Sequence, residues 1–497
     1  MMLGALAEKA GLAVGSHRED RVTGFAIDHR KVAPGTVFGA FRGANVNGED
    51  FIPAAVAAGA ICVVARPEAH VEGAAHIADA EPRRAFARIA ARFFAPFPKT
   101  VIAVTGTNGK TSTVEMTRQL WWMAGNSAAS IGTLGVTTPD GSVSTGLTTP
   151  DIVTFLSNMS GLAREGVSHV AFEASSHGLA QFRSEGPEVS AAAFTNLSRD
   201  HLDYHGTMEA YFTAKMRLFD EVVARGGTAV VWMDDPLAAT VCERARGGGL
   251  RVLTVGEQAS DGPDGVRLLA RIPTQLGQKI EIAHNGRHYH VTLPLIGAYQ
   301  AANALVAAGL VLATGGEPAA TFDALARLQP VRGRLERAAI ARSGAPIYVD
   351  YAHTPDALEA AIAALSPHVN GRLITVVGAG GDRDQGKRAP MGEAAAAGSG
   401  LVIVTDDNPR GEDPAGIRAM VMQGVARAGG EALELADRRE AIAAAIDAAR
   451  AGDIVLIAGK GHEEGQVFGR GPDTKVVPFN DVNVARECAG ISAGEIG

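Results

Sequence analysis

The sequence predicts an α/β protein of three domains, and three observations carry that prediction. The chain has 497 residues and is too long to fold around a single hydrophobic core, since domains usually hold about 150 residues. Short apolar stretches alternate with helix-like stretches, which is typical of parallel βαβ units. A loop with two glycines that ends in Gly-Lys-Thr joins an apolar strand to a helix at residues 105–111.

The first domain is expected to span residues 1–98 and to bind one end of a substrate. Apolar strands are expected at 22–27 and 60–65, and an alanine-rich helix at 53–58. The segment 94–99 carries two prolines and is expected to be a linker, because proline interrupts both helices and strands.

The second domain, residues 99–330, is expected to bind phosphate. The loop Thr105-Gly-Thr-Asn-Gly-Lys-Thr111 follows the strand 100–104 and precedes a helix at 112–123. Its glycines let backbone N–H groups approach phosphates, Lys110 supplies positive charge, and the Thr111 hydroxyl can reach Mg²⁺. Val104 stands where the first glycine of G-x-x-x-x-G-K-[ST] belongs, so the spacing is unusual. A chance Gly-Lys-Thr turn is the alternative, but it rarely lies between a buried strand and a helix.

Further strands of this domain are expected at 167–174, 191–196 and 228–233, and an antiparallel excursion at the sheet edge over 251–295. Glu173 ends an apolar strand near the phosphate loop. A carboxylate in that place holds Mg²⁺ in phosphate-loop proteins, and a surface or capping carboxylate is the alternative.

Residues 196–206 contain two histidines and two aspartates in eleven residues: Asp200, His201, Asp203 and His205. This density suits contacts to metal or phosphate, and turn residues that cap the next helix are the alternative. Zinc is not expected, because no cysteine joins the cluster.

Lys215 lies in a mostly apolar helix at 211–219. A lone lysine there usually extends its ammonium to solvent. If burial lowered its pKa, the neutral amine could react with carbon dioxide to give a carbamate, which is an anionic metal ligand.

The third domain, residues 331–497, is expected to be a doubly wound sheet of the Rossmann-like kind. Strands are expected at 347–350, 373–378, 401–405 and 454–458, and helices at 355–365 and 415–426.

Polar loops follow three of these strands, at 378–384, 406–410 and 459–463. The first invites a dinucleotide-binding interpretation, but Arg383 occupies the place of the third glycine of G-x-G-x-x-G, so an anion clamp is favoured. Loops at the carboxyl ends of neighbouring strands are where an open α/β sheet binds its ligand. The three together predict a binding site.

Composition and charge exclude several classes of protein. The net charge of −8 and the isoelectric point near 6.0 argue against a protein that binds nucleic acid by charge alone. The three cysteines lie far apart without metal-ligand spacing, which favours a reducing compartment. The N-terminus makes a poor signal peptide, and no apolar run approaches the ~18 residues of a membrane span. We therefore expect a cytoplasmic protein without nucleic-acid or membrane partners.

These motifs, in this order, resemble the Mur ligase family, whose members are ATP-dependent amino-acid ligases that build the peptide stem of bacterial peptidoglycan. The resemblance runs from Asp28-His-Arg30 to Gly459-Lys-Gly-His-Glu463, and the phosphate loop has the form found in that family. Asp407-Asn-Pro-Arg410 is similar to the signature of members that add meso-2,6-diaminopimelate rather than lysine.

The resemblance implies a role for each motif. The implied residues for the UDP-muramyl dipeptide are Asp28, His29, Arg30, the loop 43–51, Thr148, Thr149, Ser175, Gln181 and Arg183. Those for ATP are Gly106, Thr107, Asn108, Gly109, Lys110, Thr111, Ser112, Asn303, Arg334 and Asp350. Those for diaminopimelate are Arg383, Asp407, Asn408, Pro409, Arg410, Gly459 and Glu463. The implied catalytic residues are Lys110, Glu173, His201 and Lys215, and the implied Mg²⁺ ligands are Thr111, Glu173, His201 and Lys215 as N6-carboxylysine.

The resemblance also implies small-molecule substrates and a monomer. Four rival functions stay open: a lysine-adding member, a ligase like folylpolyglutamate synthetase, a phosphate-loop switch or motor, and an inactive scaffold. Asp28-His-Arg30 and Asp407-Asn-Pro-Arg410 argue against the folate ligase, and phosphate release without an amino acid would mark the motor.

Overall fold

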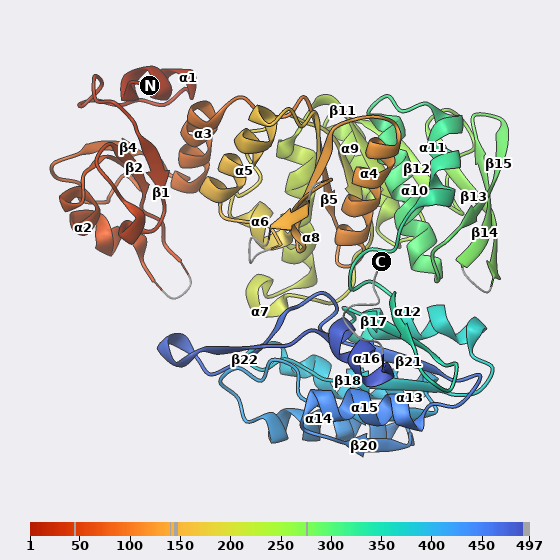
Figure 1. Cartoon of the computed structure of the whole chain (residues 1–497). Coiled ribbons are helices and arrows are strands. Elements are labelled where there is room, and N and C mark those ends of the chain that lie inside the picture. The colour runs from red at the N-terminus through yellow and green to blue at the C-terminus, as the bar shows by residue number, and fades with distance from the viewer. Residues whose placement is uncertain (44–45, 140, 144–147, 275–276, 491–497) are drawn as a thin grey trace.

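The computed structural model describes residues 1–43, 46–139, 141–143, 148–274 and 277–490. Figure 1 shows three bodies, one at the end of the molecule, one in the middle and one against one side of the middle body. Their main sheets have four, eleven and six strands, respectively. The predicted three-domain α/β architecture is confirmed. The boundaries after Pro98 and Pro330 stay a prediction.

The first sheet is parallel, with neighbours in chain order. Its strands are β1 (Gly24–Ala26), β2 (Thr36–Gly39), β3 (Ala60–Ala65) and β4 (Ala75–Ala78), and its helices are α1 (Leu3–Lys9), α2 (Ile52–Ala57) and α3 (Pro82–Phe94). Pro53 lies in the first turn of α2, where a missing N–H costs nothing. Helix α3 packs against a helix of the middle domain, α5 (Ile152–Arg164), so the two domains share buried apolar residues.

The middle sheet has seven parallel strands in the order β6-β9-β5-β10-β11-β12-β13, with antiparallel strands at both edges. The strands are β5 (Thr100–Thr105), β6 (Ala128–Gly132), β7 (Gly135–Thr138), β8 (Gly141–Val143), β9 (His169–Glu173), β10 (Val189–Phe194), β11 (Val223–Trp232), β12 (Arg251–Gly256), β13 (Gly265–Thr274), β14 (Gly277–His284) and β15 (Arg287–Leu293). The remaining helices are α4 (Lys110–Met123), α6 (Ser176–Ala180), α7 (Leu202–His205), α8 (Met208–Arg217), α9 (Ala238–Gly247), α10 (Ala298–Ala313) and α11 (Pro318–Ala324).

The prediction of an antiparallel excursion over 251–295 is wrong for its first strand, β12, which belongs to the parallel part of the sheet. Strand β12 runs parallel to β11, and β13 runs parallel to β12. Helix α9 carries the chain back to the starting edge between β11 and β12, which makes the pair a βαβ unit. The antiparallel pairs described in this range are β13 with β14 and β14 with β15.

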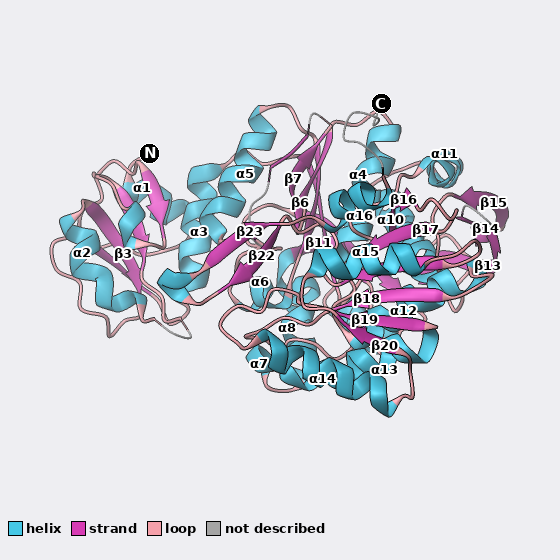
Figure 2. Ribbon diagram, turned by 60° about the horizontal axis from the view of Figure 1, so that its bottom comes forward, coloured by secondary structure: helices cyan, strands magenta, loops and turns pink. Residues whose placement is uncertain are grey.

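The third sheet has the order β16-β17-β21-β18-β19-β20 and is parallel except for β16. Figure 2 shows this sheet between α15 and α16 on one side and α13 and α14 on the other, so it is doubly wound as predicted. Its strands are β16 (Glu336–Ile340), β17 (Pro346–Asp350), β18 (Leu373–Val377), β19 (Leu401–Val404), β20 (Ala432–Glu434) and β21 (Ile454–Ala458), and a separate ribbon follows, β22 (Gly465–Phe468) and β23 (Lys475–Pro478). Its helices are α12 (Pro355–Leu365), α13 (Arg388–Gly398), α14 (Pro414–Arg427), α15 (Arg438–Ala448) and α16 (Asp481–Ala489).

Within the described ranges, no helix has both the length and the apolar character needed to cross a membrane.

Candidate active site

The phosphate loop lies between β5 and α4, as predicted. Its Lys110 ammonium donates hydrogen bonds to the carbonyl oxygens of Gly106 at 2.9 Å and Thr107 at 2.7 Å. Gly109, the residue before α4, has φ +85°, a conformation that glycine adopts without strain, and the Asn303 side chain lies against it. The free N–H groups at the start of α4 favour an anion in front of this loop.

Glu173 ends β9 beside the loop and is only 2 % exposed, so it is not a surface carboxylate. Its Oε2 accepts a hydrogen bond from the Thr111 hydroxyl at 3.0 Å, and its Oε1 accepts one from the Thr133 N–H at 2.7 Å. Burial raises the pKa of the Glu173 carboxyl, while the nearby Lys110 charge acts in the opposite direction. Arg334, from the segment before β16, donates to the same Thr111 hydroxyl at 3.0 Å.

Lys215 in α8 does not extend to solvent, since its side chain is 1 % exposed. Its Nζ donates to the Gly106 carbonyl at 2.7 Å and lies 4.3 Å from the centroid of the Tyr211 ring. Two lysine ammonium groups therefore converge on one carbonyl oxygen. Burial lowers the pKa of Lys215 well below its ordinary value, and the charge of Lys110 adds to that effect.

The histidines of the histidine and aspartate cluster lie around the His177 ring, whose centroid is 4.8 Å from that of His201 and 5.4 Å from that of His205. His201 has φ +55° and its Nε2 lies 3.4 Å from Asp200 Oδ2, at the edge of the phosphate site. Burial lowers the pKa of the His201 imidazole, so the ring is held in the neutral form that ligates metals. His205 instead lies within hydrogen-bond distance, 3.0 Å, of the Ser176 hydroxyl.

The donor groups suit Mg²⁺, which takes some of its ligands from phosphate and water, better than a metal ion whose ligands all come from the protein. Among the described residues, no group of three or more His, Cys, Asp or Glu side chains is placed to hold a metal. Mg²⁺ typically takes one or two carboxylates and draws its other ligands from phosphates and water. The pairing of Thr111 with buried Glu173 is of that kind.

The residues implied to contact the muramyl peptide gather around the end of β9. The Thr149 hydroxyl donates to the Glu173 carbonyl at 2.8 Å, and the Ser175 N–H donates to the Thr149 hydroxyl at 3.0 Å. Arg183 donates to the Thr149 carbonyl at 3.2 Å and to Gln181 Oε1 at 2.6 Å. Thr148 accepts a hydrogen bond from the Thr133 hydroxyl at 3.1 Å.

Asp28, His29 and Arg30 lie in the first domain, after β1, and do not join this cluster. Arg30 pairs with Asp28 at 2.7 Å and lowers the pKa of that carboxyl to about 2. The His29 ring stacks on Phe51 with centroids 4.3 Å apart. Residues 44 and 45 of the loop 43–51 lie outside the described residues.

The three polar loops of the third domain meet at the carboxyl ends of β18, β19 and β21. Asn408 donates to Glu463 Oε2 at 2.7 Å, which joins the second loop to the third. Arg410 donates to the Gly381 carbonyl at 2.9 Å, which joins the second loop to the first. The Arg383 guanidinium instead donates to the carbonyl of Asp382. Pro409 approaches Gly381, and Gly459 has φ +117° beside the Asp407 carboxylate.

Two adjoining cavities connect the domains at this site. One of about 140 Å³ lies over the phosphate loop, and one of about 540 Å³ lies between the muramyl-peptide residues and the three polar loops. Tyr351, His353 and His201 line both. Asp350, at the end of β17, accepts hydrogen bonds from the Leu335 N–H at 2.7 Å and the Tyr299 hydroxyl at 3.3 Å.

The sequence did not predict several residues that line the two adjoining cavities. Tyr351 and His353 follow β17 at its carboxyl end, so the argument used for the three polar loops would have found them. Burial lowers the pKa of His353 to about 4, and Lys387 adds to the effect. Thr133 carried no signal in the sequence, because it is a lone hydroxyl. Lys460 belongs to the predicted loop 459–463, but the sequence alone did not predict that its ammonium is buried.

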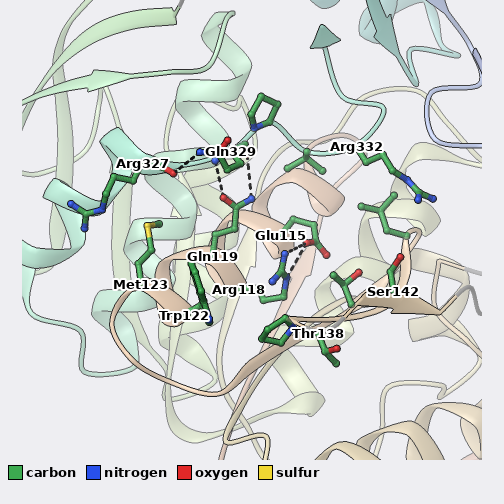
Figure 3. Close-up of a pocket in the computed structure, with 15 residues that line it drawn as sticks. Glu115, Arg118, Gln119, Trp122, Met123, Thr138, Ser142, Arg327, Gln329 and Arg332 are labelled. Carbon is green, nitrogen blue, oxygen red and sulfur yellow. Dashed lines mark hydrogen bonds and ion pairs between the residues drawn. The ribbon is translucent and has the colours of Figure 1, made fainter. Parts of the chain in front are cut away.

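A third cavity, of about 710 Å³, lies apart from this chemistry (Figure 3). It is bounded by α4, by the hairpin of β7 and β8, and by residues 327–332, which connect the middle domain to the third. Figure 3 shows Gln119 of α4 bonded to the backbone of Gln329 beside it.

Three sequence profiles match the chain. These are "Mur ligase family, catalytic domain" over residues 21–94, "Mur ligase middle domain" over 104–311, and "Mur ligase, glutamate ligase domain" over 333–461.

Several curated proteins are similar over almost the whole length. The UDP-N-acetylmuramoyl-L-alanyl-D-glutamate–2,6-diaminopimelate ligase of Zymomonas mobilis is 59% identical and covers 98% of both chains. The protein of the same name from Bradyrhizobium diazoefficiens is 50% identical and covers 93% of both.

The solved structures agree in fold. A structure of a ligase with the same name superposes with a TM-score of 0.70 at 33% identity and covers 99% of both chains. A folylpolyglutamate synthase of Mycobacterium tuberculosis shares only the fold, with a TM-score of 0.64 at 19% identity over 83% of this chain and 96% of that one. The chain therefore belongs to the Mur ligase family and is an ATP-dependent ligase.

Proposed function

We propose that this protein joins meso-2,6-diaminopimelate to UDP-N-acetylmuramoyl-L-alanyl-D-glutamate at the expense of ATP, a step in making peptidoglycan precursors. The names of the similar proteins support this assignment. The observation that supports it best is the pair of adjoining cavities, because a cavity over the phosphate loop next to one lined by charged side chains suits ATP beside a second, charged substrate.

The reaction must activate a carboxylate, whose carbon is a poor electrophile. Attack of the D-glutamyl γ-carboxylate on the ATP γ-phosphate gives an acyl phosphate and ADP, and an amine then displaces phosphate. Two anions must first approach each other. At about 4 Å their repulsion is roughly 4 kcal/mol for an effective dielectric near 20. Lys110 and Arg334 line the site and bring positive charge to it.

The metal and carbamate assignments belong to the proposal. Thr111 and Glu173 would hold one Mg²⁺, and His201 with carbamylated Lys215 would hold another. When bound, the ions supply further positive charge to the phosphates. Lys215 suits carbamylation because its amine is buried and its pKa is lowered, and a neutral amine is the form that reacts with carbon dioxide.

The remaining residues would hold the two ends of the substrates. Asp28, His29 and Arg30 bind the uridine diphosphate end in the first domain, and Thr148, Thr149, Ser175, Gln181 and Arg183 bind the muramyl peptide. Arg410 binds the distal carboxylate of diaminopimelate, because a guanidinium forms paired hydrogen bonds with a carboxylate. Lysine lacks that carboxylate.

ADP release from the purified protein tests this function. We expect repeated turnover, with more than one ADP released per enzyme molecule, only when UDP-muramoyl dipeptide and meso-diaminopimelate are both present, with Mg²⁺ and bicarbonate. Equal rates with L-lysine would favour a lysine-adding ligase. Repeated turnover without any amino acid would favour a motor or switch.

A further inference from the structure

Lys460 is a charged side chain that the proposed mechanism leaves unused. It follows β21, and its side chain is 0% exposed. Its ammonium lies within hydrogen-bond distance of four oxygen atoms: Glu463 Oε2 at 2.9 Å, Asn408 Oδ1 at 3.0 Å, Asp407 Oδ1 at 3.4 Å and Gln466 Oε1 at 3.5 Å. A buried charge needs such partners, because desolvation is otherwise very costly.

These contacts tie together two loops that are not neighbours in the sheet. Asp407 and Asn408 follow β19, Lys460 and Glu463 follow β21, and β18 lies between those strands. The ammonium stands between the carboxylates of Asp407 and Glu463. Removal of one partner from a buried ion cluster leaves charge uncompensated, so the geometry of both loops depends on Lys460.

The contacts also fix how Glu463 presents its charge. Both Lys460 and Asn408 donate to Oε2, so Oε1 is left for a ligand in the cavity that Glu463 lines. Arg410 reaches the carbonyl of Asn408 at 3.4 Å. The cation Arg410 and the anion Glu463 therefore both contact Asn408, and Lys460 holds Asn408 in place.

An amino-acid end carries an ammonium and a carboxylate on one carbon, so its receptor needs an anion and a cation side by side. Glu463 and Arg410 have this arrangement. We propose that Lys460 is a positioning residue that orients Glu463 toward the distal ammonium of diaminopimelate. This inference rests on the proposed function.

The test compares meso-diaminopimelate with 2-aminopimelate, which keeps the distal carboxylate but lacks the distal ammonium. We expect Lys460→Met to lower the ratio of kcat/KM for the two substrates at least tenfold, while KM for ATP changes less than twofold. Lys475→Met removes the same charge from the exposed face of β23 and should change neither value. In a Glu463→Gln background, Lys460→Met should not lower the ratio further.

Three results separate the possible failures. If Lys460→Met lowers kcat/KM equally for both substrates, or lowers the ratio again in the Glu463→Gln background, Lys460 does not act through Glu463 and the inference is overturned. If Lys460→Met does not fold, the Glu463→Gln variant and the double variant still make the decisive comparison. The double variant loses the negative charge of Glu463 together with the positive charge of Lys460. A wild-type protein that does not use diaminopimelate at all overturns the proposed function instead.

Discussion

Lys110 and Lys215 donate to the same carbonyl oxygen of Gly106, which is an unusual use of two positive charges. Like charges this close to each other disfavour protonation, and burial acts in the same direction for both amines. Lys215 therefore loses its proton readily, and an anion is stabilised between the side chains of Lys110 and Lys215.

Carbamylation of Lys215 gives a direct prediction. Lys215→Arg keeps the positive charge but cannot form a carbamate, so we expect kcat to fall at least ~10-fold, as for other groups that support a bound metal. Wild-type enzyme depleted of carbon dioxide should lose activity and recover it with bicarbonate. Lys99→Arg, at an exposed position, is the control. Full activity of Lys215→Arg would contradict the carbamate.

Arg410 gives the second prediction at this scale. Its guanidinium is already oriented by the carbonyls of Gly381 and Asn408, with φ +51° at its own backbone. Arg410→Lys keeps the charge and loses the paired geometry. Since one charge-assisted hydrogen bond contributes about 1.5–3 kcal/mol, kcat/KM for diaminopimelate should fall at least ~10-fold. Steady-state kinetics near those of the wild type would remove Arg410 from this role.

At the scale of elements, the sequence predicted best those strands that are buried on both faces. The strand 454–458 and the helix 355–365 lie at their predicted bounds. A continuous apolar run marks the strand, and Thr354 and Pro355 suit the cap and first position of the helix. That the polar loops after such strands meet at one edge of the sheet followed from parallel-sheet geometry. The direction of β12 and the contacts of Lys460 did not, because both depend on packing between segments far apart in the chain.

The segment that joins the middle and third domains carries an element-scale prediction. Gln119 of α4 donates to the Gln329 carbonyl at 3.2 Å and accepts from the Gln329 N–H at 2.8 Å (Figure 3). Two hydrogen bonds of about 0.5–1.5 kcal/mol each hold the segment to the helix that begins at the phosphate loop. Loss of both should raise the open population of the segment about tenfold, since 1.4 kcal/mol corresponds to a factor of ten.

Limited trypsin digestion measures that opening, because Arg327 and Arg332 flank Gln329 and are about half exposed. We expect Gln119→Ala to speed cleavage there about tenfold when opening precedes cutting. Gln258→Ala, an exposed glutamine in another part of the middle domain, serves as the matched control. Equal cleavage rates in both variants would show that Gln119 does not hold the segment.

At the scale of the whole molecule, the positive charges of the phosphate site come from two domains. Lys110 belongs to the middle domain, and Arg334 reaches across from the segment that begins the third, with its guanidinium 4.6 Å from the centroid of the Tyr351 ring. These cations repel one another until an anion lies between them. A triphosphate that contacts both Lys110 and Arg334 therefore favours approach of the third domain to the middle one.

Small-angle scattering tests this closure. Addition of a non-hydrolysable ATP analogue and UDP-muramoyl dipeptide should lower the radius of gyration toward the ~23 Å expected for a compact chain of this length. Arg334→Met keeps much of the side-chain bulk but loses the charge, so the same ligands should compact it less. The scattering of this variant without ligands should match that of the wild type. An unchanged radius in the wild type, or equal compaction in Arg334→Met, would mean that the shared phosphate does not draw the domains together.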